Sequence, residues 1–231
     1  MAINLIYIFI KNSHSQKWLK TPLLLHDFQQ LDFYKNFSII LSILFFFFSI
    51  LAKAQSTQMN YKIIRGGNDI GHLQLEKKII GTKSNLMLTS EIKTHLLFLI
   101  TVLVKESAIF ENGKLIYSSQ FRKTNGATKM DKQTLLVEDK YVVTENGEKE
   151  KLNLPLIDCN VLSLYFKEPL TVKSVYSDKQ QCYINLTKMN DGGYKIKFAD
   201  GNTNSFYYQN GVCTKVKINN PFYSIEIIHQ P

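Results

Sequence analysis

The stretch IFENGKLIYSSQFRKTNG, residues 109–126, contains two Asn-Gly pairs that enclose a segment of mixed apolar and polar residues. Asn and Gly tolerate the positive φ angles that tight hairpin turns require. Between the turns, Leu115, Tyr117 and Phe121 are expected on one face of a strand, because side chains alternate along extended backbone. A segment of this kind between two turns predicts antiparallel β-structure.

The same turn signals recur through most of the chain. Further Asn-Gly pairs lie at 146–147 and 210–211, and Gly-rich turns lie at 66–68, 191–193 and 200–201. The strands expected between these turns lie near 60–66, 70–80, 84–93, 96–110, 114–123, 133–138, 141–145, 148–153, 181–188, 193–199, 204–209 and 212–218. We therefore predict a mainly β fold, a curved antiparallel meander sheet of about 10–12 strands that forms a half-open barrel.

One stretch departs from this pattern. In LPLIDCNVLSLYFKEPL, residues 154–170, apolar residues recur three and four positions apart, Asp158 is a candidate cap, and Pro169 follows them. These signals predict one helix from Pro155 to Glu168, lying on the concave face of the sheet. Its apolar positions are Val161, Leu162, Tyr165 and Phe166.

The stretch HLLFLITVLVK, residues 95–105, is apolar on both faces of the expected strand. Such a strand needs cover on both sides, and the helix would supply it on one side. The space between sheet and helix is either a filled core or a cavity for an apolar ligand. The candidate ligand-binding residues are Phe98, Ile100, Leu162, Tyr165 and Phe166.

The stretch SILFFFFSILAKAQS, residues 42–56, has the features of a signal peptide. A basic residue, Lys35, precedes an apolar run, and Ala-Lys-Ala at 52–54 is a small-x-small cleavage site. The run is shorter than the roughly 20 residues of a transmembrane helix, which is the alternative. We expect cleavage after Ala54, so that the protein is exported to the periplasm or cell envelope and its mature chain does not span the membrane. The cleavage site has no cysteine to accept a lipid anchor.

The 34 residues before this signal are unusual, because a signal peptide normally begins a few residues before its apolar run. We expect translation to begin nearer Leu31 or Lys35. Residues 1–34 would then be a wrongly assigned or disordered extension, and the alternative is a short membrane-associated segment. The expected organisation is this extension, a signal peptide at 35–54 and a single β-rich domain at 55–231.

The chain is moderately basic, with 28 Lys and Arg against 19 Asp and Glu. Removing residues 1–54, which hold five lysines and two aspartates, leaves 23 basic and 17 acidic residues. Many lysines occupy alternating positions, which favours the solvated face of a sheet over a nucleic-acid surface. Examples are Lys195, Lys197, Lys215 and Lys217.

Three cysteines, Cys159, Cys182 and Cys213, allow at most one internal disulfide. By strand parity Cys182 lies on the face of Ile184 and Cys213 on the face of Lys215, and two strands separate them in a simple meander. We therefore expect no bond between Cys182 and Cys213, with Cys182 as a small core residue.

The chain shows no catalytic or metal-binding motif. His72, His95 and His229 are isolated, and no zinc-protease, nucleophile-elbow, phosphate-loop or paired-cysteine spacing occurs. Asp191 and Asp200 stand in turn contexts that explain them without catalysis. We expect a protein that is not an enzyme and has neither a metal nor another cofactor.

Four stretches behind the signal resemble a family of uncharacterised exported proteins from Bacteroidota, of the domain-of-unknown-function 6134 type. They are YKIIRGGNDIGHLQL, IFENGKLIYSSQFRKTNG, LNLPLIDCNVLSLYFKEP and FADGNTNSFYYQNGVC. The resemblance spans nearly all of the mature chain and implies no activity. A looser likeness joins it to periplasmic half-barrel domains that carry lipids or lipoproteins.

Two functions remain open. The first is an exported, non-enzymatic protein that binds a lipid or another apolar small molecule between sheet and helix. The second is a structural or protein-interaction component of the cell envelope, which would meet a partner through a surface strip of Phe206, Tyr207 and Tyr208.

Overall fold

The computed structural model describes residues 55–95 and 99–231. The expected extension, the signal peptide with its cleavage site after Ala54, and the candidate ligand residue Phe98 lie outside the described residues. The first apolar residues of the 95–105 stretch, Leu96 and Leu97, also lie outside the described residues. All other residues named above lie within them.

Fourteen strands and one short 3₁₀-helix account for the regular structure of the described residues. The strands are β1 (Gln55–Arg65), β2 (Asn68–Ile80), β3 (Lys83–His95), β4 (Leu99–Glu111), β5 (Lys114–Thr124), β6 (Ala127–Val137), β7 (Lys140–Glu145), β8 (Glu148–Leu152), β9 (Ser174–Ser177), β10 (Cys182–Lys188), β11 (Tyr194–Lys197), β12 (Thr203–Gln209), β13 (Val212–Asn220) and β14 (Tyr223–Gln230). The helix is η1 (Val161–Tyr165).

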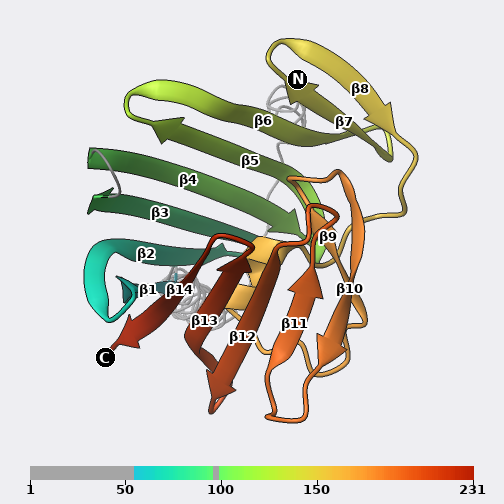
Figure 1. Cartoon of the computed structure of the whole chain (residues 1–231). Coiled ribbons are helices and arrows are strands. Elements are labelled where there is room, and N and C mark those ends of the chain that lie inside the picture. Colours follow the sequence, from blue (N-terminus) through green and yellow to red (C-terminus); the bar gives the residue numbers. More distant parts are fainter. Residues whose placement is uncertain (1–54, 96–98) are drawn as a thin grey trace, which may run out of the picture. The chain divides into compact units, whose positions relative to one another are not determined.

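All fourteen strands belong to one antiparallel sheet in the order β8-β7-β6-β5-β4-β3-β2-β1-β14-β13-β12-β11-β10-β9. The chain thus builds two meanders, β1 to β8 and β9 to β14, and β1 pairs with β14 to join them (Figure 1). The predicted antiparallel meander is confirmed. Two strands were missed: β9 is only four residues long, and β14 follows a turn at Pro221 and Phe222 that contains no glycine.

The sheet is not closed into a barrel, because β8 and β9 are its two edges and no ladder joins them. Instead β9 and the turn after it lie over the inner face of β5 and β6, the face that carries the core. We call the polar contacts between these two parts the seam. They are Ser118 Oγ to Asp178 Oδ1, Lys132 Nζ to the Lys179 carbonyl at 3.3 Å, and Thr134 Oγ1 to Tyr176 Oη at 3.5 Å.

The core lies between the two meanders. Its largest fully buried side chains are Tyr61, Tyr141, Tyr176, Phe206, Ile63, Leu75, Leu115, Ile157, Leu164, Ile196, Val143 and Val175. Both meanders contribute to this set, and Leu164 comes from η1. Packing of the two meanders against each other therefore buries the inner face of the sheet.

The side chains of β5 do not face as predicted, because the strand contains a β-bulge. Phe110 pairs with Leu115 and Ile109 with Tyr117, so Ile116 is an extra residue on β5. An extra residue reverses the alternation of side chains beyond it. Leu115 is therefore buried in the core, whereas Tyr117 lies on the other face, contrary to the prediction that they share one.

The burial of two cysteines also differs from the prediction, because β13 contains a second bulge. Tyr207 pairs with Lys215 and Tyr208 with Cys213, so Thr214 is the extra residue on β13. Cys213 is consequently buried, and Cys182, expected in the core, is exposed near the turn that begins β10. Even so, two strands separate them and all three cysteines of the chain are free, so the expected absence of a bond between these two agrees with the structure.

The predicted helix from Pro155 to Glu168 is wrong. Only Val161–Tyr165 is helical, as a 3₁₀-turn capped by Asn160 rather than by Asp158. The preceding residues are extended because their backbone groups bond to distant strands: the Leu115 amide donates to the Ile157 carbonyl at 2.7 Å. An α-helix would have to take those groups into its own ladder.

The short η1 still packs between the two meanders, against β3, β4, β9 and β13. Leu162 and Leu164 are buried, and the ring of Tyr165 meets Phe206 edge to face at 5.4 Å between centroids. The apolar residues of this segment recur at helical spacing because η1 is buried between the two meanders, and not because the segment is a full helix. The expectation that β4 is covered on both faces is also wrong, because Leu99 and Leu103 are exposed.

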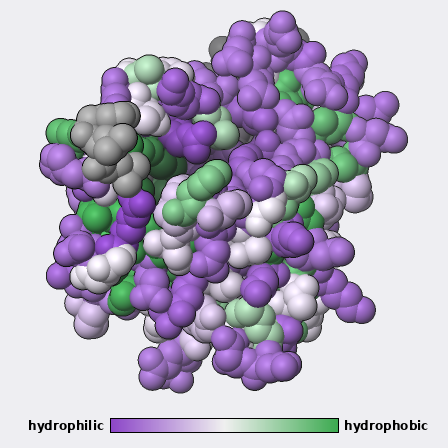
Figure 2. Space-filling model, in the orientation of Figure 1, coloured by the Kyte–Doolittle hydropathy of each residue, from purple (hydrophilic) through white to green (hydrophobic). Residues whose placement is uncertain are grey.

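The outer face of the sheet is mainly hydrophilic. The view in Figure 2 shows polar residues over most of the surface, with hydrophobic residues scattered among them. Lys195 and Lys197 on β11 are exposed, in agreement with the predicted solvated face. Across residues 55–95 and 99–231, no helix is long and apolar enough to cross a membrane.

Candidate functional site

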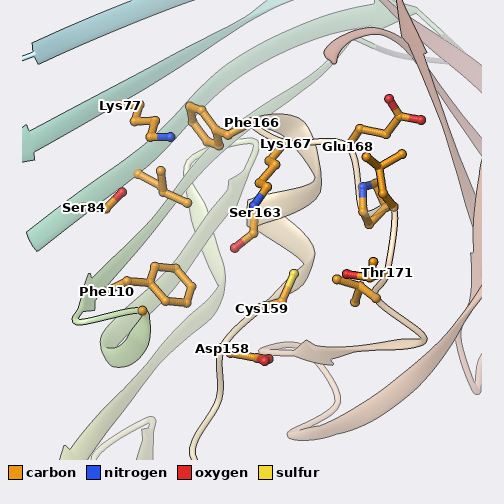
Figure 3. A pocket seen from close by; sticks show the side chains of 15 residues that line it. Lys77, Ser84, Phe110, Asp158, Cys159, Ser163, Phe166, Lys167, Glu168 and Thr171 are labelled. Carbon is orange, nitrogen blue, oxygen red and sulfur yellow. The ribbon is translucent and has the colours of Figure 1, made fainter. Parts of the chain in front are cut away.

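The segment from Asp158 to Val172 and the adjoining ends of β2, β3 and β4 enclose a pocket of about 580 Å³ (Figure 3). We call it the Phe166 pocket, after the aromatic side chain that enters it from the end of η1. Strand pairing fixes its sheet side, because Lys77 stands opposite Leu86 and Ser84 stands opposite Phe110. Concave sites of roughly 300–1,000 Å³ are typical of small-molecule binding.

The floor of the Phe166 pocket is apolar. Leu86 on β3 and Phe110 on β4 are buried beneath it, and half-buried Phe166 and Val172 form its walls. The turn at Leu170 and Thr171, just before Val172, also places exposed Leu170 at the pocket's edge. This lining can hold an apolar group of a small molecule by removing its surface from water.

Polar side chains stand at defined places around this floor. Lys77, Ser84 and Lys167 line the pocket, and Ser163 is already engaged, since its hydroxyl donates to Asn160 Oδ1 at 2.8 Å. Glu168 accepts a hydrogen bond from the Tyr194 hydroxyl at 3.1 Å. The pocket is therefore amphipathic, with an apolar floor and a charged rim.

Cys159 is the one thiol in the pocket lining, and its chemistry is that of an inert group. Burial, followed by the negative charge of Asp158, raises the pKa of the thiol to about 11. The sulfur lies 3.8 Å from the Asn160 carbonyl, to which it donates. A thiol with this pKa is protonated at neutral pH, so it is a poor nucleophile.

Residues 61–230 match the family defined as the domain of unknown function DUF6134. The chain belongs to this family. The chain is similar to a crystal structure of a beta-barrel-like protein of the domain of unknown function DUF1849 from Brucella abortus. The match covers 75% of this chain and 95% of that chain, at 11% sequence identity and a TM-score of 0.48. No curated protein matches the chain.

The fold separates the candidate ligand residues of the DUF6134 chain that were predicted from sequence. Phe166 lines the pocket, but Leu162 and Tyr165 are buried in the core and do not reach it. Ile100 is on the inner face near the other end of β4, about 34 Å along the strand from Phe110 at about 3.4 Å per residue. Phe166 alone of the described candidates therefore belongs to the site.

Sequence reasoning missed the sheet residues of the site. Lys77, Ser84, Leu86 and Phe110 all lie close to hairpin turns of the DUF6134 domain, and parity alone places them on the inner face. That parity was readable from the sequence. What the sequence did not provide was the long-range contact that brings the segment after η1 over these hairpins.

A second polar group lies on the inner face of the DUF6134 domain, away from the pocket. Glu106, Gln120, Lys132 and Glu145 stand directly opposite one another across β4, β5, β6 and β7, and we call them the inner polar row. Gln120 Nε2 donates to Glu106 Oε1 at 3.2 Å, and Lys132 Nζ lies 3.0 Å from Glu145 Oε2. Cross-strand pairs of this kind fix the register of the four strands.

Asp178 connects the inner polar row to the seam. The side chain is buried, and its carboxylate accepts hydrogen bonds from Ser118 Oγ and, at 3.0 Å, from Asn160 Nδ2. Burial raises the pKa of Asp178, while these two hydrogen bonds and the charge of Lys132 oppose the rise. Since Asn160 also caps η1, one carboxylate fixes β5, β9 and the helix together.

Glu106 should make the stability of this domain depend on pH. Burial, followed by the negative charge of Asp178, raises the pKa of Glu106 from 4.5 to about 7. Because the folded state holds this proton more tightly, the stabilisation is fully present below pH 4.5 and is lost as pH rises through about 7. Glu106→Gln should therefore be as stable as wild type near pH 4.5 and more stable than wild type near pH 8, by about 3 kcal/mol at 1.36 kcal/mol per pKa unit.

Urea denaturation of wild type and Glu106→Gln near pH 4.5 and near pH 8 measures this difference in stability. The matched control is Glu111→Gln, on the same strand, whose carboxylate forms an exposed pair with Lys83 at 3.5 Å. The control should gain nothing near pH 8. Equal gains for both variants, or none for Glu106→Gln, would show that the Glu106 carboxylate is well solvated.

Within the described part of the chain, no three His, Cys, Asp or Glu side chains come close enough together to hold a metal ion. The two aspartates predicted in turns have that role: Asp191 Oδ1 accepts from the Gly193 amide and Asp200 Oδ1 from the Asn202 amide, each at 3.1 Å. These carboxylates satisfy local backbone groups.

Proposed function

We propose that the mature chain is an exported protein without catalytic activity that holds a lipid or another apolar small molecule in the Phe166 pocket. The observation that carries this proposal is the apolar floor of a 580 Å³ pocket, made by Leu86 and Phe110 and overhung by Phe166. The protonated thiol of Cys159 is compatible with binding rather than chemistry.

The proposed ligand site, the Phe166 pocket, is not the space predicted between sheet and helix. The ligand would lie outside the packed core, at the hairpin end of β2 to β4, and not on the inner face beside Ile100. Its walls come from the segment after η1, which is irregular and contains turns up to Val172. Such a segment can adjust to a ligand without disturbing the seam.

Phe166→Ala tests the proposal, because Phe166 is half-buried at the pocket whereas Leu162, four residues earlier, is buried in the core. The Phe166 variant should lose about 1–2 kcal/mol of stability, less than a fully buried phenylalanine, because Phe166 is only partly buried where it packs against the core. It should also retain much less apolar ligand after purification from a bacterial envelope. Chemical denaturation and solvent extraction of the same preparations measure the two quantities.

Leu162→Ala is the matched control. It should lose about 2–5 kcal/mol, as for a buried leucine, yet keep its ligand at temperatures where it remains folded. A reversed result, with Phe166→Ala unfolding easily and binding ligand normally, would place Phe166 in the core. If neither variant nor wild type carries a ligand, the pocket is not a binding site.

Export is part of the proposal and has its own test. Cleavage after Ala54 would leave the described residues 55–95 and 99–231 in the mature chain. The mature N-terminus of protein from a fractionated bacterial envelope should therefore be Gln55, determined by N-terminal sequencing. Protein that retains residues 1–54 would contradict both the export and the expected organisation of the chain.

An interaction role in the envelope is the second candidate function. The predicted strip does not support it, because Phe206 is buried and the Tyr208 hydroxyl donates to the Leu164 carbonyl, which leaves only Tyr207 outside. A different feature does: four apolar residues stand opposite one another on the outer face of β4 to β7. They are Ile109, Tyr117, Leu135 and Val142. A partner recovered with wild type but not with Leu135→Lys would favour this function.

A further inference from the structure

We propose that the molecule bound in the Phe166 pocket is a single-chain amphiphile with an anionic head group, a carboxylate or phosphate, held by Lys77 and Lys167. This inference rests on the proposed function and adds the chemistry of the head group. It follows from the charges around the pocket rather than from its apolar floor.

Lys77 is unusual among the lysines of its hairpin. Its side chain lies on the inner face of β2, half-buried and directly opposite buried Leu86. The neighbouring Lys78 and Lys83 have carboxylate partners, at 3.0 Å from Glu76 and 3.5 Å from Glu111. Within the described part of the chain, Lys77 forms no ion pair, and a half-buried ammonium beside apolar groups favours an anion from outside.

Lys167 supplies a second positive charge from the opposite wall. It follows Phe166, and among the described residues it too forms no ion pair. In Figure 3 the Lys77 side chain ends beside the ring of Phe166, and the Lys167 side chain enters from the other wall and ends beside Ser163, while Ser84 lies on the same side as Lys77. The Ser84 hydroxyl, which has no side-chain hydrogen-bond partner in the described residues, can donate to an anionic oxygen there.

The two acidic residues of the lining do not occupy this space. The Glu168 carboxylate accepts from Tyr194 on β11, and Figure 3 shows it turned away from Lys77. Asp158 is exposed at the opposite end of the pocket, below Cys159. The two lysines therefore stand on opposite walls of the pocket, on β2 and on the segment after η1, and a head group between them would leave Phe110 and Leu86 as the floor for its chain.

The pocket volume favours one chain rather than several. A site of about 580 Å³ lies within the range for a single small molecule. The apolar contribution then comes from one alkyl chain on the floor and against Phe166. The head group would account for selectivity among ligands of equal chain length, because paired charges and hydrogen bonds discriminate more strongly than apolar contact.

Isothermal titration calorimetry of residues 55–231 with four dodecyl probes tests this inference. Dodecanoate and dodecyl phosphate carry the two anionic heads, dodecanol is neutral, and dodecylamine is cationic, all below their aggregation concentrations. At least one anionic probe should bind about tenfold more tightly than dodecanol, the effect of about 1.4 kcal/mol from charged hydrogen bonds. Which anion binds more tightly distinguishes a fatty-acid head from a lipid phosphate, and either agrees with the inference.

The double variant Lys77→Met, Lys167→Met should lose this preference and keep its affinity for dodecanol, which also shows that it remains folded. Lys195→Met, an exposed lysine on β11, is the control and should bind as wild type does. Equal binding of dodecanoate, dodecyl phosphate and dodecanol by wild type, or a preference for dodecylamine, would overturn the head-group inference and leave an apolar site. Binding of no probe would overturn both this inference and the proposed function.

Discussion

Asp178→Ala should lower the free energy of unfolding by about 3–5 kcal/mol, the usual cost of removing one partner from a buried charged network. The carboxylate accepts from Ser118 and Asn160, and the charge of Lys132 acts on it. Without it, two buried donors lose their acceptor and Lys132, whose side chain is 7% exposed, keeps Glu145 as its one ion-pair partner among the described residues. Urea denaturation at neutral pH measures the loss.

Asp200→Ala is the matched control. Asp200 pairs with Lys179, the residue next to Asp178, but both side chains are about 40% exposed. Removing this exposed pair should cost under about 1 kcal/mol. If Asp178→Ala costs no more than this control, the seam does not hold β9 against β5 and β6, and packing alone positions the second meander.

Phe206→Ala should cost a similar amount, about 3–5 kcal/mol, because truncating a buried phenylalanine leaves a cavity. Phe206 on β12 is fully buried and meets Tyr165 of η1 edge to face, so it is one of the contacts by which the second meander holds the short helix. Such aromatic pairs add to the effect of burial. The loss should appear as a lower denaturation midpoint.

Phe222→Ala is the same chemical change at a side chain that is 90% exposed, in the turn between β13 and β14. It should leave the midpoint within about 0.5 kcal/mol of wild type. Equal effects of the two substitutions would show that the rings of Phe206 and Tyr165 do not form a packed core.

The sequence predicted what depends on local chemistry. The Asn-Gly turns at 112–113 and 125–126 define hairpins because Asn112 and Asn125 adopt positive φ angles of 50° and 49°. Repeated turns of this kind imply an antiparallel meander, which the structure has. Family membership also followed from sequence, since residues 61–230 match the DUF6134 domain.

What the sequence did not predict depends on pairing at a distance. Extra residues at Ile116 and Thr214 reverse the facing of Leu115 relative to Tyr117 and of Cys213 relative to Lys215, and nothing local marks them as bulges. The predicted helix begins at Pro155, yet the residues before η1 are extended and their backbone groups bond to other strands. Tyr141 Oη, for example, accepts from the Ile157 amide at 2.9 Å.

The candidate site was predicted in part for the same reason. Phe166 was correctly chosen, but its partners were sought on the apolar strand near Ile100, because apolar character was the available signal. The structure instead brings Phe166 to the hairpin ends that carry Lys77 and Phe110. Only the curl of the sheet, with β9 lying over β5 and β6, places these segments together.

Native mass spectrometry of residues 55–231, exported to and purified from a bacterial envelope, tests whether the Phe166 pocket holds an anionic amphiphile. We expect wild-type protein with one bound molecule, whose fragments include an alkyl chain and an anionic head, and a Phe166→Ala variant that is largely empty. Wild-type protein that carries no molecule, or a variant that carries the same molecule to the same extent, would contradict it.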